Sequence, residues 1–183
     1  MGKSYNKKMT DTTIRLGEVR FCFANVFAPR HNDSGEDKYG VCVLVPKEDT
    51  QAKKIFDEAR EAAIKQGIAG KWNGKRPSGL KLCELRDGDE DRPDDDAFAG
   101  HWYFNASAKK APGVAVLDGG TVTDALDDDD FYSGCYGAVT VNLYPYANQS
   151  KGVAAGLNNV IKTRDGEKFS GGSSAAEDFA DMA

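Results

Sequence analysis

A short run near the N-terminus, Arg20–Phe27, most limits the folds that are open to this chain. Its side chains alternate with the two-residue period of a β-strand. One face would carry Phe21, Phe23 and Phe27, and the other Cys22, Ala24 and Val26. Neither face is polar, so we expect both to be covered by the rest of the chain or used for binding.

The next elements predict a hairpin followed by a helix. Lys38–Pro46 is a second β-rich run that stops at Pro46, and the loop Pro29–Asp37 joins it to the first. Asp49 or Thr50 then caps a helix that we expect to reach about Gln66, with Gly67 as its terminator. Apolar residues recur in it at helical spacing: Ala52, Ile55, Phe56, Ala59, Ala62 and Ala63. One amphipathic helix that covers a sheet is the expected result.

Three further runs read as strands. His101–Ser107 places Tyr103 and Asn105 on one face and Trp102 and Phe104 on the other, and Gly156–Arg164 forms the last strand. Phe131–Tyr146 is the longest candidate, with Val139, Val141 and Leu143 inward and Tyr136, Thr140, Asn142 and Tyr144 outward. About five strands with a helix between the early ones predict a mainly β fold with one or two helices, an OB-fold-like closed barrel.

The chain divides into one domain with two appendages. At 183 residues, of which 40% are hydrophobic, it can bury a single core. We place the OB-fold domain at residues 14–169, after a flexible N-terminus of residues 1–13. Residues 170–183 form a Gly/Ser-rich run with an acidic tip, which predicts a disordered C-terminal tail.

The cysteines and the hydropathy indicate a cytoplasmic protein. Cys22, Cys42, Cys83 and Cys135 are far apart and form no C-x-x-C motif, so we expect reduced, buried thiols and neither a metal nor a cofactor. The N-terminus has no apolar signal region, and no run of apolar residues is long enough for a membrane.

The net charge of -5 hides an uneven distribution. Residues 1–81 contain 16 Lys and Arg and 10 Asp and Glu, whereas residues 82–183 contain 8 and 19. An acidic total is weak evidence against nucleic-acid binding, because association responds to the local potential of a groove.

The segment Gly70–Lys81 gathers cations around one tryptophan. Its Gly and Pro content predicts a mobile basic arm, in which Trp72 stacks on an unpaired base while Lys71, Lys75, Arg76 and Lys81 contact phosphates. The alternative is that Trp72 packs over the edge of the domain. Similarly, the outward tyrosines of Phe131–Tyr146 either form a stacking platform or merely cover the sheet.

Two acidic segments, Asp87–Asp96 and Asp127–Asp130, invite a calcium interpretation. An EF-hand loop that begins at Asp87 would need Gly where Arg92 stands, so a solvated acidic loop is favoured. A metal-dependent nuclease would need carboxylates on regular elements, and neither His31 nor His101 has an evident partner in the sequence. We therefore expect no enzymatic activity, and keep a calcium-stabilised structural virion module as the alternative.

Several short motifs, in their order, carry a resemblance to a known family. They are Phe23-x-Asn-Val-Phe27, Lys38-Tyr39, Leu44-Val-Pro-Lys47, Leu85-Arg-Asp-Gly-Asp89, Phe104-Asn-Ala106, Tyr132-Ser-Gly134 and Gly152-Val-Ala-Ala-Gly-Leu157. Over residues 14 to 164 the chain resembles the single-stranded-DNA-binding proteins of tailed phages, a family formerly catalogued as a domain of unknown function. The resemblance implies an OB-fold core, single-stranded DNA binding without strong sequence preference, and a role in phage replication or recombination in the host cytoplasm.

The residues themselves predict the contacts. The expected DNA-binding set is Arg30, Lys38, Tyr39, Lys71, Trp72, Lys75, Arg76, Lys81, Tyr103, Lys109, Lys110, Tyr136, Tyr144 and Lys151. In the tail, Glu177, Asp178, Phe179 and Asp181 are expected to compete for the DNA groove or to dock on a phage or host replication or recombination protein. Phe179 is not the terminal residue, unlike the aromatic residue at the tip of other replicative single-strand binders.

Overall fold

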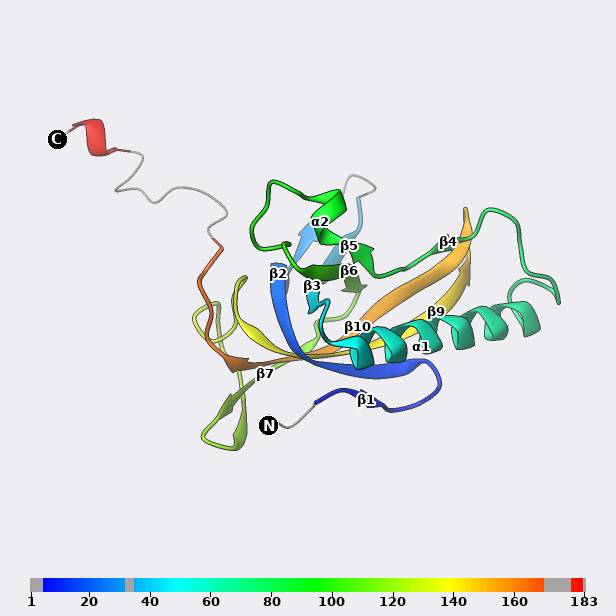
Figure 1. Cartoon of the computed structure of the whole chain (residues 1–183), viewed down its shortest axis with the longest axis horizontal. Helices are drawn as coiled ribbons and strands as arrows, with labels where there is room; N and C mark the ends of the chain where they lie inside the picture. The colour runs from blue at the N-terminus through cyan, green and yellow to red at the C-terminus, as the bar shows by residue number, and fades with distance from the viewer. Residues whose placement is uncertain (1–4, 32–34, 170–178, 183) are drawn as a thin grey trace.

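One large sheet organises the computed structural model, which describes residues 5–31, 35–169 and 179–182 (Figure 1). The strands are β1 Lys7–Lys8, β2 Thr13–His31, β3 Asp37–Pro46, β4 Lys81–Leu82, β5 Arg86–Asp87, β6 His101–Ala108, β7 Gly113–Asp118, β8 Thr121–Asp124, β9 Tyr136–Ala147 and β10 Lys151–Arg164. The helices are α1 Thr50–Ala69, α2 Gly88–Asp91 and the 3-10 turn η1 Ala180–Met182.

Five of these strands close a barrel. They follow the order β6, β3, β2, β9 and β10, and β10 pairs with β6 in parallel at Gly156 and Ser107. The predicted hairpin is confirmed, because β2 and β3 pair antiparallel. Val139, Val141 and Leu143 of β9 are buried in the main core, as predicted. The mainly β closed barrel expected from the sequence is therefore the observed fold.

Helix α1 lies along the barrel and begins where the sequence predicts (Figure 1). The Asp49 carboxylate caps it by accepting a hydrogen bond from the Ala52 amide at 3.0 Å. On the buried face, the ring centroid of Phe56 lies 4.9 Å from that of Phe104. The predicted end of the helix is wrong, since α1 continues through Gly67 to Ala69. Gly67 is required there for space, because a β-carbon would lie 2.6 Å from the Trp72 ring.

Two strand predictions are corrected. β9 begins at Tyr136 rather than Phe131, and the buried Phe131 ring packs 4.9 Å from that of Phe21. The alternation of Arg20–Phe27 is broken, because the register of β2 shifts between Cys22 and Asn25. As a result Phe21 is buried in the main core, whereas Phe23 is exposed.

The ends of the chain differ from expectation in one respect. Residues 5–13 were expected to be flexible, but β1 pairs with β2 and the Asn6 side-chain amide donates to both Asp49 carboxylate oxygens, at 3.0 and 2.9 Å. In the tail, Glu177 and Asp178 lie outside the described residues. Phe179 is exposed, and Asp181 lies in η1.

The cysteines behave largely as predicted. All four are free thiols, with Cys22, Cys42 and Cys135 buried and Cys83 partly buried. Within the described residues, no helix has the length and apolar character needed to cross a membrane.

Candidate nucleic-acid interface

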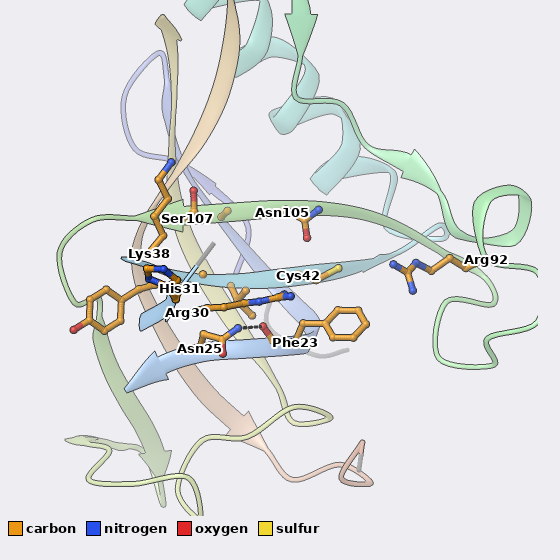
Figure 2. A pocket seen from close by; sticks show the side chains of 13 residues that line it. Phe23, Asn25, Arg30, His31, Lys38, Cys42, Arg92, Asn105 and Ser107 are labelled. Atoms are coloured by element: carbon orange, nitrogen blue, oxygen red, sulfur yellow. Dashed lines mark hydrogen bonds between the residues drawn. The ribbon is translucent and has the colours of Figure 1, made fainter. Parts of the chain in front are cut away.

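An open groove of about 550 Å³ lies over β2, β3 and β6 (Figure 2). Its lining combines an exposed ring, cations and neutral hydrogen-bonding groups, and its described members include no Asp or Glu. They are Phe23, Asn25, Arg30, His31, Lys38, Tyr39, Gly40, Val41, Cys42, Arg92, Asn105, Ala106 and Ser107. Such a set can accept phosphates and the faces of bases together.

A bulge in β2 presents the ring of Phe23 to this groove. Phe23 has a φ of 50°, a conformation that a bulky residue adopts only where its surroundings hold it. The Asn25 side-chain amide Nδ2 donates to the Phe23 carbonyl oxygen at 3.1 Å, which stabilises the bulge. The ring is 52% exposed, so it is the largest exposed aromatic surface that lines the groove.

Arg92 reaches the groove from the loop that follows α2 (Figure 2). Its guanidinium carbon lies 5.4 Å from the ring centroid of Phe23 and 4.9 Å from that of the buried Phe98. The Arg92 amide also donates to the Gly88 carbonyl oxygen at 3.0 Å. The Arg92 charge is therefore held beside the exposed Phe23 ring by contacts with Phe23 on one side and Phe98 on the other.

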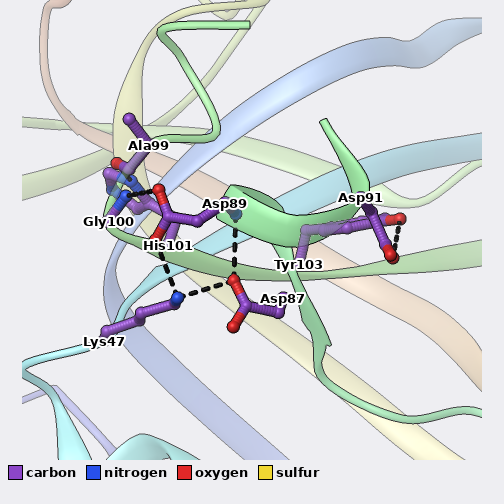
Figure 3. Close-up of polar contacts among 8 residues, drawn as sticks. All are labelled: Lys47, Asp87, Asp89, Asp91, Ala99, Gly100, His101 and Tyr103. Atoms are coloured by element: carbon purple, nitrogen blue, oxygen red, sulfur yellow. Dashed lines mark hydrogen bonds and ion pairs between the residues drawn. The ribbon is translucent and has the colours of Figure 1, made fainter. Parts of the chain in front are cut away.

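A set of ion pairs fixes the α2 loop to the barrel (Figure 3). Lys47 directly follows β3. Its Nζ lies 2.6 Å from Asp87 Oδ1 and 2.7 Å from Asp89 Oδ2. Asp89 Oδ1 accepts from the Gly100 amide at 3.0 Å. Gly88 lies so close to the barrel that a β-carbon would approach the Phe98 carbonyl oxygen to 2.5 Å.

The third carboxylate of this loop is also paired. Asp91 Oδ2 accepts from the Tyr103 hydroxyl at 2.8 Å and from Arg86 Nε at 2.9 Å. Asp89 and Asp91 are exposed, as expected of a solvated acidic loop, but Asp87, Asp89 and Asp91 each also have a cationic partner.

The Lys47 pairs should make stability depend on pH. Hydrogen bonds from Lys47 hold the pKa of Asp87 and of Asp89 below the ordinary 3.8. Carboxyls with lowered pKa values stabilise the fold above their unfolded-state pKa, and this contribution is lost as the pH falls through the folded-state value. We expect Lys47→Met to melt below wild type at pH 7, with the gap closing below about pH 4. Thermal melts across this range measure it, and a gap independent of pH would contradict it.

Several predicted residues come together at the groove. Arg30 lies opposite Lys38 across the β2–β3 hairpin, and Tyr39 lies beside them. Tyr39 pairs with Ala108, which immediately precedes Lys109 and Lys110, so these two exposed lysines extend the positive charge at that end. Lys38 Nζ has an ion-pair partner in Glu36 at 3.5 Å, a solvent-exposed pair that phosphate can displace.

A second group of predicted residues lies elsewhere, at the hairpin end of β9 and β10. Lys81 pairs with Gly152, next to Lys151, and the connection that carries Lys71, Lys75 and Arg76 leads from α1 to this strand. Tyr144 is 39% exposed on β9. Figure 1 shows the tips of β9 and β10 to the right of α2, beside β4.

Two of the predicted stacking rings are buried, which corrects their assignment. Trp72 is 3% exposed and its Nε1 donates to the Tyr146 carbonyl oxygen at 3.1 Å, so the alternative of packing against the domain holds. Tyr103 is 7% exposed, with its ring edge against Phe98. Both residues cover apolar surface that would otherwise face water.

A third ring, that of Tyr136, is partly covered by cations. The guanidinium carbon of Arg164 lies 3.8 Å from its centroid, and that of Arg20 lies 4.9 Å away. These arginines occupy surface of the ring that a stacked base would need.

The sequence analysis missed Phe23 and Arg92, the central pair of the groove. The alternation placed Phe23 on the same face as Phe21 and could not separate the two, because a bulge leaves no clear mark in a two-residue period. Arg92 had a signal that was not used, since it is the only cation of Asp87–Asp96. Asn25, His31, Asn105 and Ser107 were also not predicted.

Comparisons with known proteins point in one direction. Residues 12–183 match the family model described as the ssDNA-binding protein of Enterobacter phage Enc34. Protein p50 of Acyrthosiphon pisum secondary endosymbiont phage 1 is 37% identical over 179 residues, covering 92% of this chain and 93% of its own length.

Solved structures agree with the sequence comparisons. The single-stranded DNA-binding protein of bacteriophage Enc34 in complex with ssDNA superposes with a TM-score of 0.75 at 25% identity, covering 93% of this chain and 100% of that one. The single-stranded DNA-binding protein gp2.5 of bacteriophage T7 has a TM-score of 0.56 at 17% identity over 95% of this chain and 96% of its own, a likeness of fold alone.

Proposed function

We propose that this chain, which belongs to the family of the Enterobacter phage Enc34 ssDNA-binding protein, binds single-stranded DNA in the groove over β2, β3 and β6. The observation that carries the proposal is the pairing of the exposed Phe23 ring with the Arg92 guanidinium, beside the cations Arg30 and Lys38. Unpaired bases offer their faces to a ring, whereas duplex DNA does not.

The groove binds DNA through two kinds of contact, with phosphates and with base faces. Arg30, Lys38 and Arg92 neutralise phosphates and release counterions, which makes the affinity strongly dependent on salt. Phe23 accepts a base face, a contact that every base can make. Neither contact reads sequence. We infer a binding role without catalysis, on exposed single strands during phage DNA replication or recombination in the host cytoplasm.

The salt dependence of DNA binding can show whether DNA follows the groove or the predicted basic residues at the hairpin end of β9 and β10. The affinity falls as salt rises, so a plot of log affinity against log salt has a negative slope. Replacing Arg30 and Lys38 together with alanine should make this slope less steep by about one unit for each lost phosphate contact. The matched control replaces Lys71 and Lys75 at the hairpin end, and should leave the slope unchanged. Anisotropy titrations of labelled oligo-dT at several salt concentrations measure both, with duplex DNA and RNA as competitors. A larger loss in the control variant would move the DNA path to the hairpin end.

The acidic tail is proposed to compete with DNA for the groove or to dock on a replication or recombination partner. Glu167, Lys168 and Phe169, which lead into the tail, line a pocket together with Phe23 and Arg92. The described chain therefore leads into the tail from a pocket that includes the groove cation Arg92.

Removing the tail tests the competition. Deletion of residues 171–183 should tighten ssDNA binding, most clearly at about 50 mM salt, where charges are weakly screened. The effect should shrink as salt rises. Equal or weaker binding of the truncated protein at low salt would count against competition and leave partner docking as the role of the tail.

A further inference from the structure

The proposal concerns two cysteines that lie under the groove. Cys22 on β2 and Cys42 on β3 are direct partners in the antiparallel register. Cys42 lines the groove itself (Figure 2), and Cys22 lines the adjoining pocket. Phe23 and Arg92 line both spaces, so both thiols lie close to the pair that anchors the proposed DNA site.

The geometry of the pair suits a disulfide. Residues directly opposite in an antiparallel pair point to the same face, with α-carbons about 4.5 or 5.5 Å apart, and both separations fall within the range of natural disulfides. The β-carbons must approach by about 1 Å, and the register shift directly after Cys22 interrupts the β2–β3 pairing on one side of it. We propose that Cys22 and Cys42 form a redox-active dithiol that closes to a disulfide beneath the DNA groove.

The surroundings distinguish the two thiols chemically. The Cys42 thiol donates a hydrogen bond to Cys22, which lowers the pKa of Cys22 and raises that of Cys42. Arg92 also lowers the pKa of Cys22, whereas burial and Asp95 oppose this. By contrast, burial raises the pKa of Cys83 and of Cys135 to about 11. Cys22 is therefore the thiol best suited to begin the reaction.

With a peroxide as oxidant the chemistry balances. The Cys22 thiolate attacks one peroxide oxygen, the O–O bond breaks, and a sulfenic acid forms with release of water once a proton is taken up. The Cys42 sulfur then attacks the sulfenic sulfur, the S–S bond forms, and a second water leaves with the Cys42 proton. Two thiols are oxidised and one peroxide is reduced, and a thiol reductant reverses the result.

The experiment oxidises the full chain with hydrogen peroxide and maps disulfides by mass spectrometry without reduction. We expect a Cys22–Cys42 bond, with Cys83 and Cys135 still free, and its reversal by dithiothreitol. Cys22→Ser and Cys42→Ser should each abolish the intramolecular bond, whereas the control Cys83→Ser should keep it. Mapping of the wild-type protein does not depend on whether the variants fold. Stable sulfenic or sulfinic acids without the bond, or a bond between other cysteines, would overturn the proposal.

A second arm rests on the proposed function. DNA held on Phe23 and Arg92, which line the Cys22 pocket as well as the groove, should screen both thiols. Oligo-dT at ten times its dissociation constant leaves about one tenth of the protein unbound, so disulfide formation should slow about tenfold. A bond that forms equally fast with bound DNA would confirm the dithiol but remove this groove as the DNA path. No bond, in a protein that binds oligo-dT normally, would overturn the dithiol and leave the proposed function standing.

Discussion

Replacing Trp72 with alanine is expected to lower the free energy of unfolding by about 3–5 kcal/mol. The indole is buried against Gly67, and its Nε1 donates to the Tyr146 carbonyl oxygen. The substitution removes this packing and leaves a cavity between the end of α1 and the β9–β10 hairpin. Because domains are typically stable by about 5–15 kcal/mol, this single change removes a large part of the total.

Urea unfolding of the Trp72→Ala variant measures the loss, with the adjacent exposed Lys71→Ala as the matched control. The control should unfold within about 0.5 kcal/mol of wild type. Under conditions where both variants remain folded, affinity for oligo-dT should be unchanged by Trp72→Ala. A stable variant with weakened DNA binding would instead restore Trp72 as a stacking residue.

Replacing Phe23 with alanine is expected to weaken ssDNA binding by about 1–3 kcal/mol, the usual value of one base stacked on an aromatic ring. That corresponds to a loss of about 5-fold to 150-fold in affinity. The loss should be of similar size at low and high salt, because the ring carries no charge. Titration of labelled oligo-dT at two salt concentrations measures it.

Two variants make the Phe23 experiment decisive. Phe23→Gly removes the same ring and suits the positive φ of this position, so its stability should equal or exceed that of wild type while DNA binding weakens as in Phe23→Ala. Leu126→Ala removes an exposed apolar side chain outside the groove and should bind normally. Wild-type affinity in both Phe23 variants would show that no base stacks on this ring.

The strands and the helix could be predicted because their patterns are local. The inward set Val139, Val141 and Leu143 repeats every second residue, and Asp49 is a favourable cap directly before a helical repeat. The end of α1 could not be predicted, because Gly67 reads as a terminator unless the position of the Trp72 ring is known. The contact between Gly67 and the Trp72 ring, which forms after the chain has turned back, explains why the helix continues past Gly67.

The candidate site was predicted in part for a similar reason. Arg30, Lys38 and Tyr39 lie on a hairpin whose pairing follows from neighbouring sequence, and all three line the groove. Trp72 and Tyr103 were included in the expected DNA-binding set, with packing over the domain edge left as the alternative for Trp72. The sequence could not decide this, because the burial of both rings depends on elements distant in the chain. Arg92 is carried to the groove by the acidic loop, which pairs with Lys47, a residue distant in the sequence.

The sequence alone therefore determined the β-rich barrel, its early helix and the cationic hairpin, because periodicity, capping and charge act over a few residues. The tertiary structure alone decided which rings meet water and which cations stand together. The burial of a side chain depends on every segment that packs against it. A bulge or a loop ion pair can therefore expose or bury a side chain without any change in the local sequence pattern. For that reason Phe23 and Arg92, separated by most of the first half of the chain, became neighbours only in the folded protein.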